Sequence, residues 1–259
     1  MVPVEQFQLG DDLIPNRRRH RIGMIVPSSN SNAEPDGLML VPEGVTIHAT
    51  RSGGYDINAT PDADEMRRFA HQALGDQLQL LTDAQVELIA YACTSATLAE
   101  GPEFDRQFCD EIAAKSGVPG VTTAGAIIEA LHDLRVKRIA FTSPYVASLN
   151  QEAIAFIEAC DIEVVNQLGF DEELDSLQQN DLTPADAYRM GLAADHAEAE
   201  ALVISCTAYR STEAIVALEK SLNKPVVTSN SALLYIAMKR LGIACSDIAA
   251  GGRLYSGRN

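Results

Sequence analysis

The sequence predicts an α/β protein of two pseudo-symmetric lobes, each a parallel sheet flanked by helices, with the active site in the cleft between them. Three observations lead to this fold class. Short β-branched runs alternate with helical stretches, a set of landmarks recurs once along the 259 residues, and two cysteines stand where predicted strands end. Alternation of strands and helices is typical of parallel sheets.

The strands of the first half are short apolar runs rich in valine and isoleucine. They read "RIGMIVP" at 21–27, "VTIHATR" at 45–51 and "ELIAYAC" at 87–93. Runs of four to eight such residues favour strands over helices. We therefore expect three strands of one sheet before residue 94.

Helices are expected in the intervals between these strands. Residues 61–83 place apolar side chains at a period of 3.6 and have Pro61 at the first position, which predicts one long helix. A second helix is predicted over 101–117, where Gly117 stands at the position of a left-handed C-cap.

The second half of the chain repeats the landmarks of the first half in the same order. Two similar α/β lobes explain this better than a solenoid, whose repeats are much shorter. The paired segments are "RIGMIVPSSNSN" from Arg21 with "RIAFTSPYVASLN" from Arg138, "LIAYACTSAT" around Cys93 with "LVISCTAYRST" around Cys206, and "VPGVTTAGAII" from Val118 with "KPVVTSNSALL" from Lys224.

Composition excludes several classes of function. A net charge of −16 and a pI near 4.6 argue against nucleic-acid binding, which needs cations to neutralise phosphates. No run approaches the roughly 18 to 20 apolar residues of a membrane span, and acids occupy the first 16 residues where a signal peptide would be basic. Five scattered cysteines without zinc-ligand spacing indicate free thiols. We expect a cytoplasmic protein that binds neither nucleic acid nor membrane.

Cys93 and Cys206 each end an apolar strand and precede hydroxyl residues. Ligands of parallel sheets bind beyond the carboxyl ends of the strands, so two facing lobes would place one thiol on each wall of a cleft. A strand-to-helix junction is expected to lower the thiol pKa and make thiolate accessible at neutral pH. Thr94, Ser95 and Thr207 would cradle a carboxylate or its enediolate. A base and an acid on opposite faces can invert a carbon without a cofactor.

Five motifs give a more specific resemblance. "RIGMIVPSSN", "YACTSAT", "SPYVASLN", "SCTAYRST" and "RLYSGRN" resemble the maleate cis–trans isomerase branch of the aspartate/glutamate/hydantoin racemase superfamily, from Arg21 to the C-terminus. The resemblance implies a second lobe inserted in the first, which divides the chain into 1–122 plus 229–259 and 123–228. It also implies no metal, no cofactor, and a homodimer or higher homo-oligomer.

Residue roles follow from the same resemblance. Cys93 would be the thiolate and Cys206 the acid partner. Pro27 and Asn30 of "VPSSN" and the hydroxyl residues after each cysteine would contact a small carboxylate substrate, and Tyr145 of "SPY" would close the pocket. In the implied reaction, the thiolate adds to one alkene carbon of maleate and the second cysteine protonates its neighbour. Rotation and elimination then give fumarate.

One segment departs from the family pattern. "LGFDEELDS" at 168–176 lacks the asparagine that the isomerases carry there, and has Asp171, Glu172 and Glu173 instead. If Glu172 lines the pocket, an acidic wall would repel a dianion and suit a substrate that carries an amine, as in an amino-acid racemase or epimerase. An exposed acidic loop is the alternative interpretation of the same charges.

Two further functions stay open at this point. An arylmalonate-type decarboxylase needs only the cysteine of the second lobe and an oxyanion cradle. A non-catalytic small-molecule binding protein can use two facing lobes simply to clamp a ligand, and would need no reactive thiol.

Overall fold

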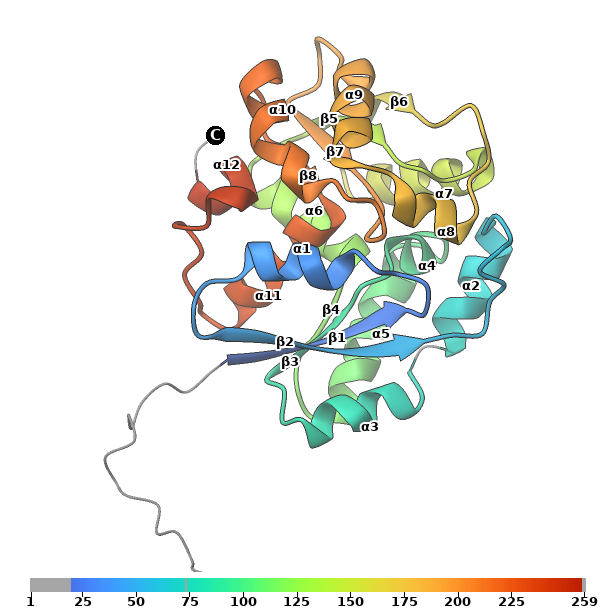
Figure 1. Ribbon diagram of the computed structural model, residues 1–259, viewed down its shortest axis with the longest axis vertical. Helices are drawn as coiled ribbons and strands as arrows, with labels where there is room; N and C mark the ends of the chain where they lie inside the picture. Colours follow the sequence, from blue (N-terminus) through green and yellow to red (C-terminus); the bar gives the residue numbers. More distant parts are fainter. Residues whose placement is uncertain (1–19, 73, 258–259) are drawn as a thin grey trace, which may run out of the picture.

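The computed structural model of the chain describes residues 20–72 and 74–257 and contains two four-stranded parallel sheets (Figure 1). The segment 1–16, on which the expectation about a signal peptide rests, lies outside the described residues. No helix in the described ranges is long and apolar enough to cross a membrane.

The first sheet contains β1 (His20–Pro27), β2 (Val45–Ser52), β3 (Leu88–Tyr91) and β4 (Gly120–Thr122), and the second contains β5 (Arg138–Thr142), β6 (Glu163–Leu168), β7 (Ala201–Ile204) and β8 (Val226–Thr228). The helices are α1 (Ala33–Leu40), α2 (Ala63–Gln72), α3 (Asp76–Asp83), α4 (Thr94–Leu98), α5 (Pro102–Ser116), α6 (Thr123–Asp133), α7 (Ala147–Glu158), α8 (Ser176–Asp181), α9 (Pro184–Ala194), α10 (Ile215–Leu222), α11 (Ser229–Arg240) and α12 (Gly252–Ser256), with 3₁₀ turns η1 (Thr212–Ala214) and η2 (Ala249–Gly251).

The two sheets have the same topology, which confirms the predicted pseudo-symmetry. Their strand orders are β2-β1-β3-β4 and β6-β5-β7-β8. β1 pairs in parallel with β2 and β3, as β5 pairs with β6 and β7. All four residues of β3 and all four of β7 are buried, as expected for strands covered by helices on both faces. The two cysteine-bearing loops therefore leave equivalent strands.

The predicted helix over 61–83 is wrong in two respects, because the chain forms α2 and α3 in place of a single helix and α2 begins at Ala63, two residues after Pro61. Gly75 precedes α3 with a ψ of −129°, which lies outside the helical region, so the helical hydrogen-bond pattern is interrupted there. The predicted end of α5 is confirmed. Gly117 has a φ of 75°, and its N–H donates to the Ala113 carbonyl.

Helices that follow the last strand of each sheet join the two halves of the molecule. α6 follows β4, α11 follows β8, and these two helices pack against each other (Figure 1). The C-terminal α12 packs against α10 and β8, and the Arg253 N–H donates to the Glu219 carboxylate at 2.9 Å. The division into 1–122 plus 229–259 and 123–228 stays a prediction.

A buried carboxyl on α1 joins this helix to η1 and α11 through hydrogen bonds. Asp36 accepts hydrogen bonds from Thr212 Oγ1 at 2.6 Å and from Asn230 Nδ2 at 2.8 Å. Its side chain is 2 % exposed, and burial raises its pKa to about 6 although both hydrogen bonds act in the opposite direction. Asn230 also donates to the carbonyl of Thr207, so this carboxyl lies directly behind the second cysteine loop.

We predict a pH-dependent stability term from Asp36. A raised folded-state pKa means that the native protein binds this proton more tightly than the unfolded chain, so stability is lost as pH rises from about 4 through about 6. Asp36→Asn keeps an acceptor oxygen and cannot ionise. Its free energy of unfolding in urea, relative to wild type, should rise by about 2–3 kcal/mol between pH 4 and pH 7.5. A difference that is independent of pH would contradict this assignment.

Candidate active site

One cavity of about 50 Å³ lies between the lobes and contains both strand-end cysteines. Its volume is enough for a few water molecules, the scale of a small organic acid. No charged side chain is among the described residues that line it. The lining residues are Pro27, Ser29, Asn30, Tyr55, Pro61, Met66, Phe69, Cys93, Thr94, Ser95, Tyr145, Ser176, Gln179, Cys206, Thr207 and Ala208.

The two cysteines occupy equivalent loops with different backbone geometry. Cys93 follows β3 and caps α4 with an extended backbone. Cys206 follows β7 with a φ of 118°, a region that non-glycine residues rarely adopt. Its N–H donates to Ser229 Oγ at 2.9 Å, and this bond helps hold the strained backbone. The fold thus fixes where the Cys206 sulfur points.

Hydrogen bonds between the two cysteine loops connect the lobes. Ser229 Oγ, which accepts the Cys206 N–H, also lies 2.8 Å from Thr94 Oγ1. Thr207 Oγ1 donates to the carbonyl of Ala92 at 2.9 Å, so each loop reaches across to the other. Thr94 and Thr207 are therefore positioned by contacts that span the cleft.

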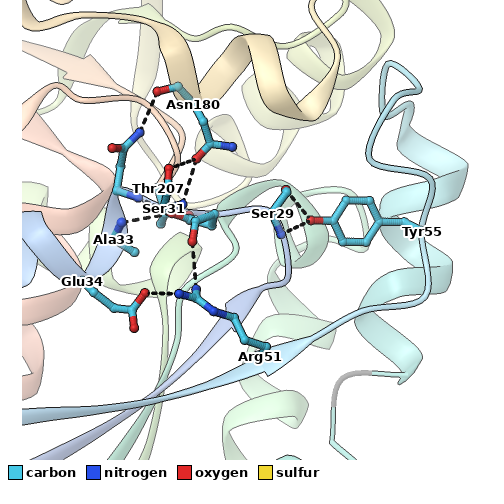
Figure 2. A network of polar contacts seen from close by, with 10 residues as sticks. Ser29, Ser31, Ala33, Glu34, Arg51, Tyr55, Asn180 and Thr207 are labelled. Atoms are coloured by element: carbon cyan, nitrogen blue, oxygen red, sulfur yellow. Dashed lines mark hydrogen bonds and ion pairs between the residues drawn. The ribbon is translucent and has the colours of Figure 1, made fainter.

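Asn30 connects the "PSSN" motif to the second lobe. Its Nδ2 donates to Thr207 Oγ1 at 2.9 Å, and its Oδ1 accepts the N–H groups of Asn32 and Ala33 at the start of α1. Arg51 Nη1 donates to the Asn30 carbonyl, and Arg51 pairs with Glu34 (Figure 2). One Nδ2 hydrogen of Asn30 remains for a ligand, because an amide nitrogen carries two donors.

The structure brings together every sequence-predicted site residue except Glu172. Pro27, Asn30, Thr94, Ser95, Tyr145 and Thr207 line the cavity with both cysteines. Glu172, like Asp171 and Glu173, is exposed and does not line the cavity. The pocket position expected for Glu172 is a correction, because α8 rather than the acidic loop covers the cavity. The described residues therefore give the cavity no acidic wall that would favour an amine-bearing substrate.

Sequence reasoning missed two groups of lining residues. Tyr55, Pro61, Met66 and Phe69 form an apolar wall from the segment after β2, and the Tyr55 and Phe69 rings stack edge to face with centroids 5.0 Å apart. Gln179 comes from α8 after β6. Neither group sits in a motif, and both reach the cavity only through tertiary packing. Tyr55 OH lies 2.7 Å from Ser29 Oγ and ties the apolar wall to the "PSSN" loop (Figure 2).

The expectation of lowered thiol pKa values is wrong. Cys93 is 5 % exposed and Cys206 is 7 % exposed. Burial raises the pKa of both thiols, that of Cys206 to about 12, although backbone N–H groups after each cysteine act in the opposite direction. The five-residue α4 and the N–H groups offset only part of the desolvation of a thiolate.

Hydrogen bonds favour the thiolate at both sulfurs, and at Cys206 they come from the Ala208 and Tyr209 N–H groups and the Tyr145 hydroxyl. Around Cys93, the Ala96 N–H and the Ser95 and Tyr91 hydroxyls favour the thiolate, and Ser95 Oγ lies 3.8 Å from the sulfur. A negative charge on Cys93 raises the pKa of Cys206 further. The two thiols therefore ionise one at a time, as expected for close acidic pairs.

No group of three or more histidine, cysteine, aspartate or glutamate side chains within residues 20–72 and 74–257 is placed to hold a metal ion.

Tyr145 is buried with its hydroxyl 3.1 Å from Ser205 Oγ, and burial raises its pKa well above the usual value. At neutral pH the cavity thus presents neutral hydrogen-bonding groups and two thiols.

We predict that Cys206 stays protonated through pH 10 in the native protein. Because its pKa lies near 12, the rate of alkylation by iodoacetamide, followed by peptide mass spectrometry, should increase about tenfold per pH unit from 7 to 10 without a plateau. A plateau below pH 9 would contradict the effect of burial.

We also predict that Glu172→Gln leaves turnover nearly unchanged. The side chain is exposed and outside the cavity, so kcat/KM for the substrate should stay within about twofold of wild type. A change of tenfold or more, measured in a steady-state assay, would return Glu172 to the site.

Curated relatives match almost the whole chain. A maleate isomerase of Pseudomonas putida KT2440 is 30 % identical over 255 residues, covering 92 % of this chain and 98 % of its own. One of Geobacillus stearothermophilus is 28 % identical over 255 residues, covering 93 % of this chain and 99 % of its own.

Among solved structures, the maleate isomerase Iso of Pseudomonas putida S16, a cysteine-to-alanine variant crystallised with maleate, has a TM-score of 0.82 and 25 % identity. The alignment covers 92 % of this chain and 98 % of that one. The family model described as arylmalonate decarboxylase matches residues 22–255. The chain therefore belongs to the arylmalonate decarboxylase family, in the branch that also contains the maleate isomerases.

Proposed function

We propose that this protein is a cofactor-independent cis–trans isomerase that converts maleate into fumarate with the thiols of Cys93 and Cys206. One observation carries the proposal: the two cysteines of equivalent loops share one small cavity between the lobes. The maleate isomerases that match this chain nearly end to end support the choice of substrate.

The first chemical step is an addition. The Cys93 thiol gives its proton to water, and its thiolate forms a bond to one alkene carbon of maleate. The electron pair of the double bond moves to the neighbouring carbon and is delocalised into the adjacent carboxylate as an enediolate. Cys206 S–H then gives its proton to that carbon, which is general-acid catalysis. Burial of Cys93 makes loss of its proton the costly part of this step.

The second step reverses the first after a rotation. The former alkene bond is now single, so the two carboxylates can turn to opposite sides. The Cys206 thiolate takes the proton back from the carbon that it protonated, and the double bond forms again as the carbon–sulfur bond breaks. Fumarate and the Cys93 thiolate are released, and the thiolate can regain its proton from water. Protons and electrons balance over the cycle, so the reaction needs no external oxidant or reductant.

Neutral donors would hold the two carboxylates. Asn30 and Ser95 both line the cavity that the substrate would fill, and would donate through the free Nδ2 hydrogen of Asn30 and through the Ser95 hydroxyl once it turns from Met66. Developing charge on an enediolate is stabilised most by such fixed donors in a site that excludes water. In this proposal Pro27, Thr94, Tyr145 and Thr207 complete the substrate contacts.

Decarboxylation of an arylmalonate is the second candidate, favoured by the apolar wall after β2. Tyr55, Met66 and Phe69 offer a surface that suits an aromatic ring. A decarboxylase of this kind needs only Cys206, whereas here Cys93 faces the same cavity. Loss of CO₂ that survives Cys93→Ala would select this function.

We predict that maleate is converted to fumarate, as followed by proton NMR, and that both cysteines are needed. Cys93→Ala removes the nucleophile and should reduce turnover to background. Cys206→Ala removes the acid and should lower kcat by about 10²- to 10⁴-fold.

The matched control is Cys245→Ala, because Cys245 is a free cysteine outside the cavity. This variant should retain wild-type turnover. Conversion that survives in Cys93→Ala, or a wild type that leaves maleate unchanged, would overturn the proposed function.

A further inference from the structure

We infer that Gln179 is a positioning residue that holds Cys206 in its protonated form, ready to act as the acid. This inference rests on the proposed function, in which Cys206 is the proton donor. Gln179 lies on α8, its side chain is 6 % exposed, and it lines the cavity. Its Oε1 lies 3.7 Å from Cys206 Sγ.

The orientation of the Gln179 amide is fixed by its second contact. Nε2 donates to the carbonyl oxygen of Leu174 at 3.0 Å. A carbonyl can only accept a hydrogen bond, so Nε2 must face Leu174 and Oε1 must face Cys206. Flipping the amide would place two oxygens against each other at Leu174, which costs the buried carbonyl its donor.

An amide oxygen that faces a sulfur favours the thiol over the thiolate. The Cys206 S–H can donate to Oε1, whereas a thiolate would meet the oxygen's partial negative charge. Among the described residues, Cys93 contacts the Ser95 hydroxyl and no amide oxygen, and a hydroxyl can turn to donate to a thiolate. At Cys206, the Tyr145 hydroxyl and the N–H groups of Ala208 and Tyr209 act against the Gln179 oxygen. Burial and a charge on Cys93 raise the pKa of Cys206, and the Gln179 oxygen would act in the same direction.

α8 is anchored strongly enough to hold the amide in place. Asp175 and Gln178 form a reciprocal capping box at its first turn. Asn180, the next residue after Gln179, accepts the Ser31 N–H at 2.9 Å through Oδ1, and its carbonyl accepts from Asn32 Nδ2 at 2.9 Å (Figure 2). These contacts join α8 of the second lobe to the "PSSN" loop of the first. Gln179 is therefore held at Cys206 by the same bonds that close the lobes over the cavity.

The consequence for the reaction is a division of labour between the two thiols. A general acid must be protonated when the substrate is bound. The Gln179 oxygen raises the free energy of the Cys206 thiolate, and so favours the protonated thiol. Ionisation is then directed to Cys93, which becomes the nucleophile. After it has given its proton, the Cys206 thiolate is a stronger base for the elimination step.

Gln179→Met tests this role, because methionine keeps an unbranched side chain of similar length and loses the amide oxygen. In substrate-free protein, with Cys93→Ala as the background and the Cys93→Ala/Cys206→Ala double variant subtracted, thiolate absorbance reports Cys206 alone. Loss of the acceptor should lower the pKa of Cys206 so that the thiolate fraction at a given pH rises about tenfold. Gln179→Glu, which keeps an oxygen and adds a negative charge, should lower that fraction.

Gln178→Met is the matched control, since it removes a capping contact of the same helix but none at Cys206. In the same Cys93→Ala background, it should leave the Cys206 titration where the background alone has it. An unchanged titration in Gln179→Met, or an equal change in Gln178→Met, would overturn the positioning role.

Turnover separates this inference from the proposed function. In otherwise wild-type protein, Gln179→Met should lower kcat for maleate about tenfold with KM within about twofold, and should move the alkaline limb of the pH–rate profile to lower pH. A wild type inactive on maleate, together with the expected change in Cys206 titration, would refute the isomerase and still support the Gln179–Cys206 contact. Wild-type turnover with no change in Gln179→Met would do the reverse.

Discussion

Exclusion of water from two facing thiols is the constraint on which the site depends. Cys93 and Cys206 are each less than a tenth exposed, and that burial opposes formation of either thiolate. The remaining polar groups of the site must therefore determine which sulfur ionises, and they must stabilise the thiolate that forms. The hydrogen bonds of Ser229 and Thr207 across the cleft serve the same end, since they keep both loops in contact and the cavity closed.

Pseudo-symmetry builds the site, and departures from it make the two thiols unequal. Equivalent strands β3 and β7 deliver the cysteines, but the segments that follow β2 and β6 differ. On the side of Cys93, Met66 Sδ accepts from Ser95 Oγ and the wall is apolar. On the side of Cys206, α8 presents the Gln179 amide. Two sulfurs in equivalent surroundings could exchange roles, whereas the different residues around Cys93 and Cys206 assign one role to each.

The fold, and the site residues that belong to sequence motifs, could be predicted from local sequence. The strand runs, the Gly117 cap and the repeat predicted two equivalent sheets, and every motif residue taken for the pocket lines it. Gln179 and Met66 were beyond reach because they come from helices whose approach to the cavity is set by tertiary packing. Glu172 was misplaced for the same reason. The direction of the thiol pKa shifts was predicted wrongly, because a motif does not show how deeply the end of a strand is buried.

In the proposed reaction, Cys93 adds covalently to the substrate while Cys206 supplies the proton. Mass spectrometry of Cys206→Ala, after incubation with maleate and acid quench, can establish this assignment of roles. With the acid partner gone, addition followed by slow protonation from water should leave a succinyl adduct that is poorly eliminated. We expect the peptide that contains Cys93 to gain the mass of one maleic acid, and we expect no adduct in Cys93→Ala/Cys206→Ala. An unmodified Cys93 peptide, or an adduct on another cysteine, would contradict it.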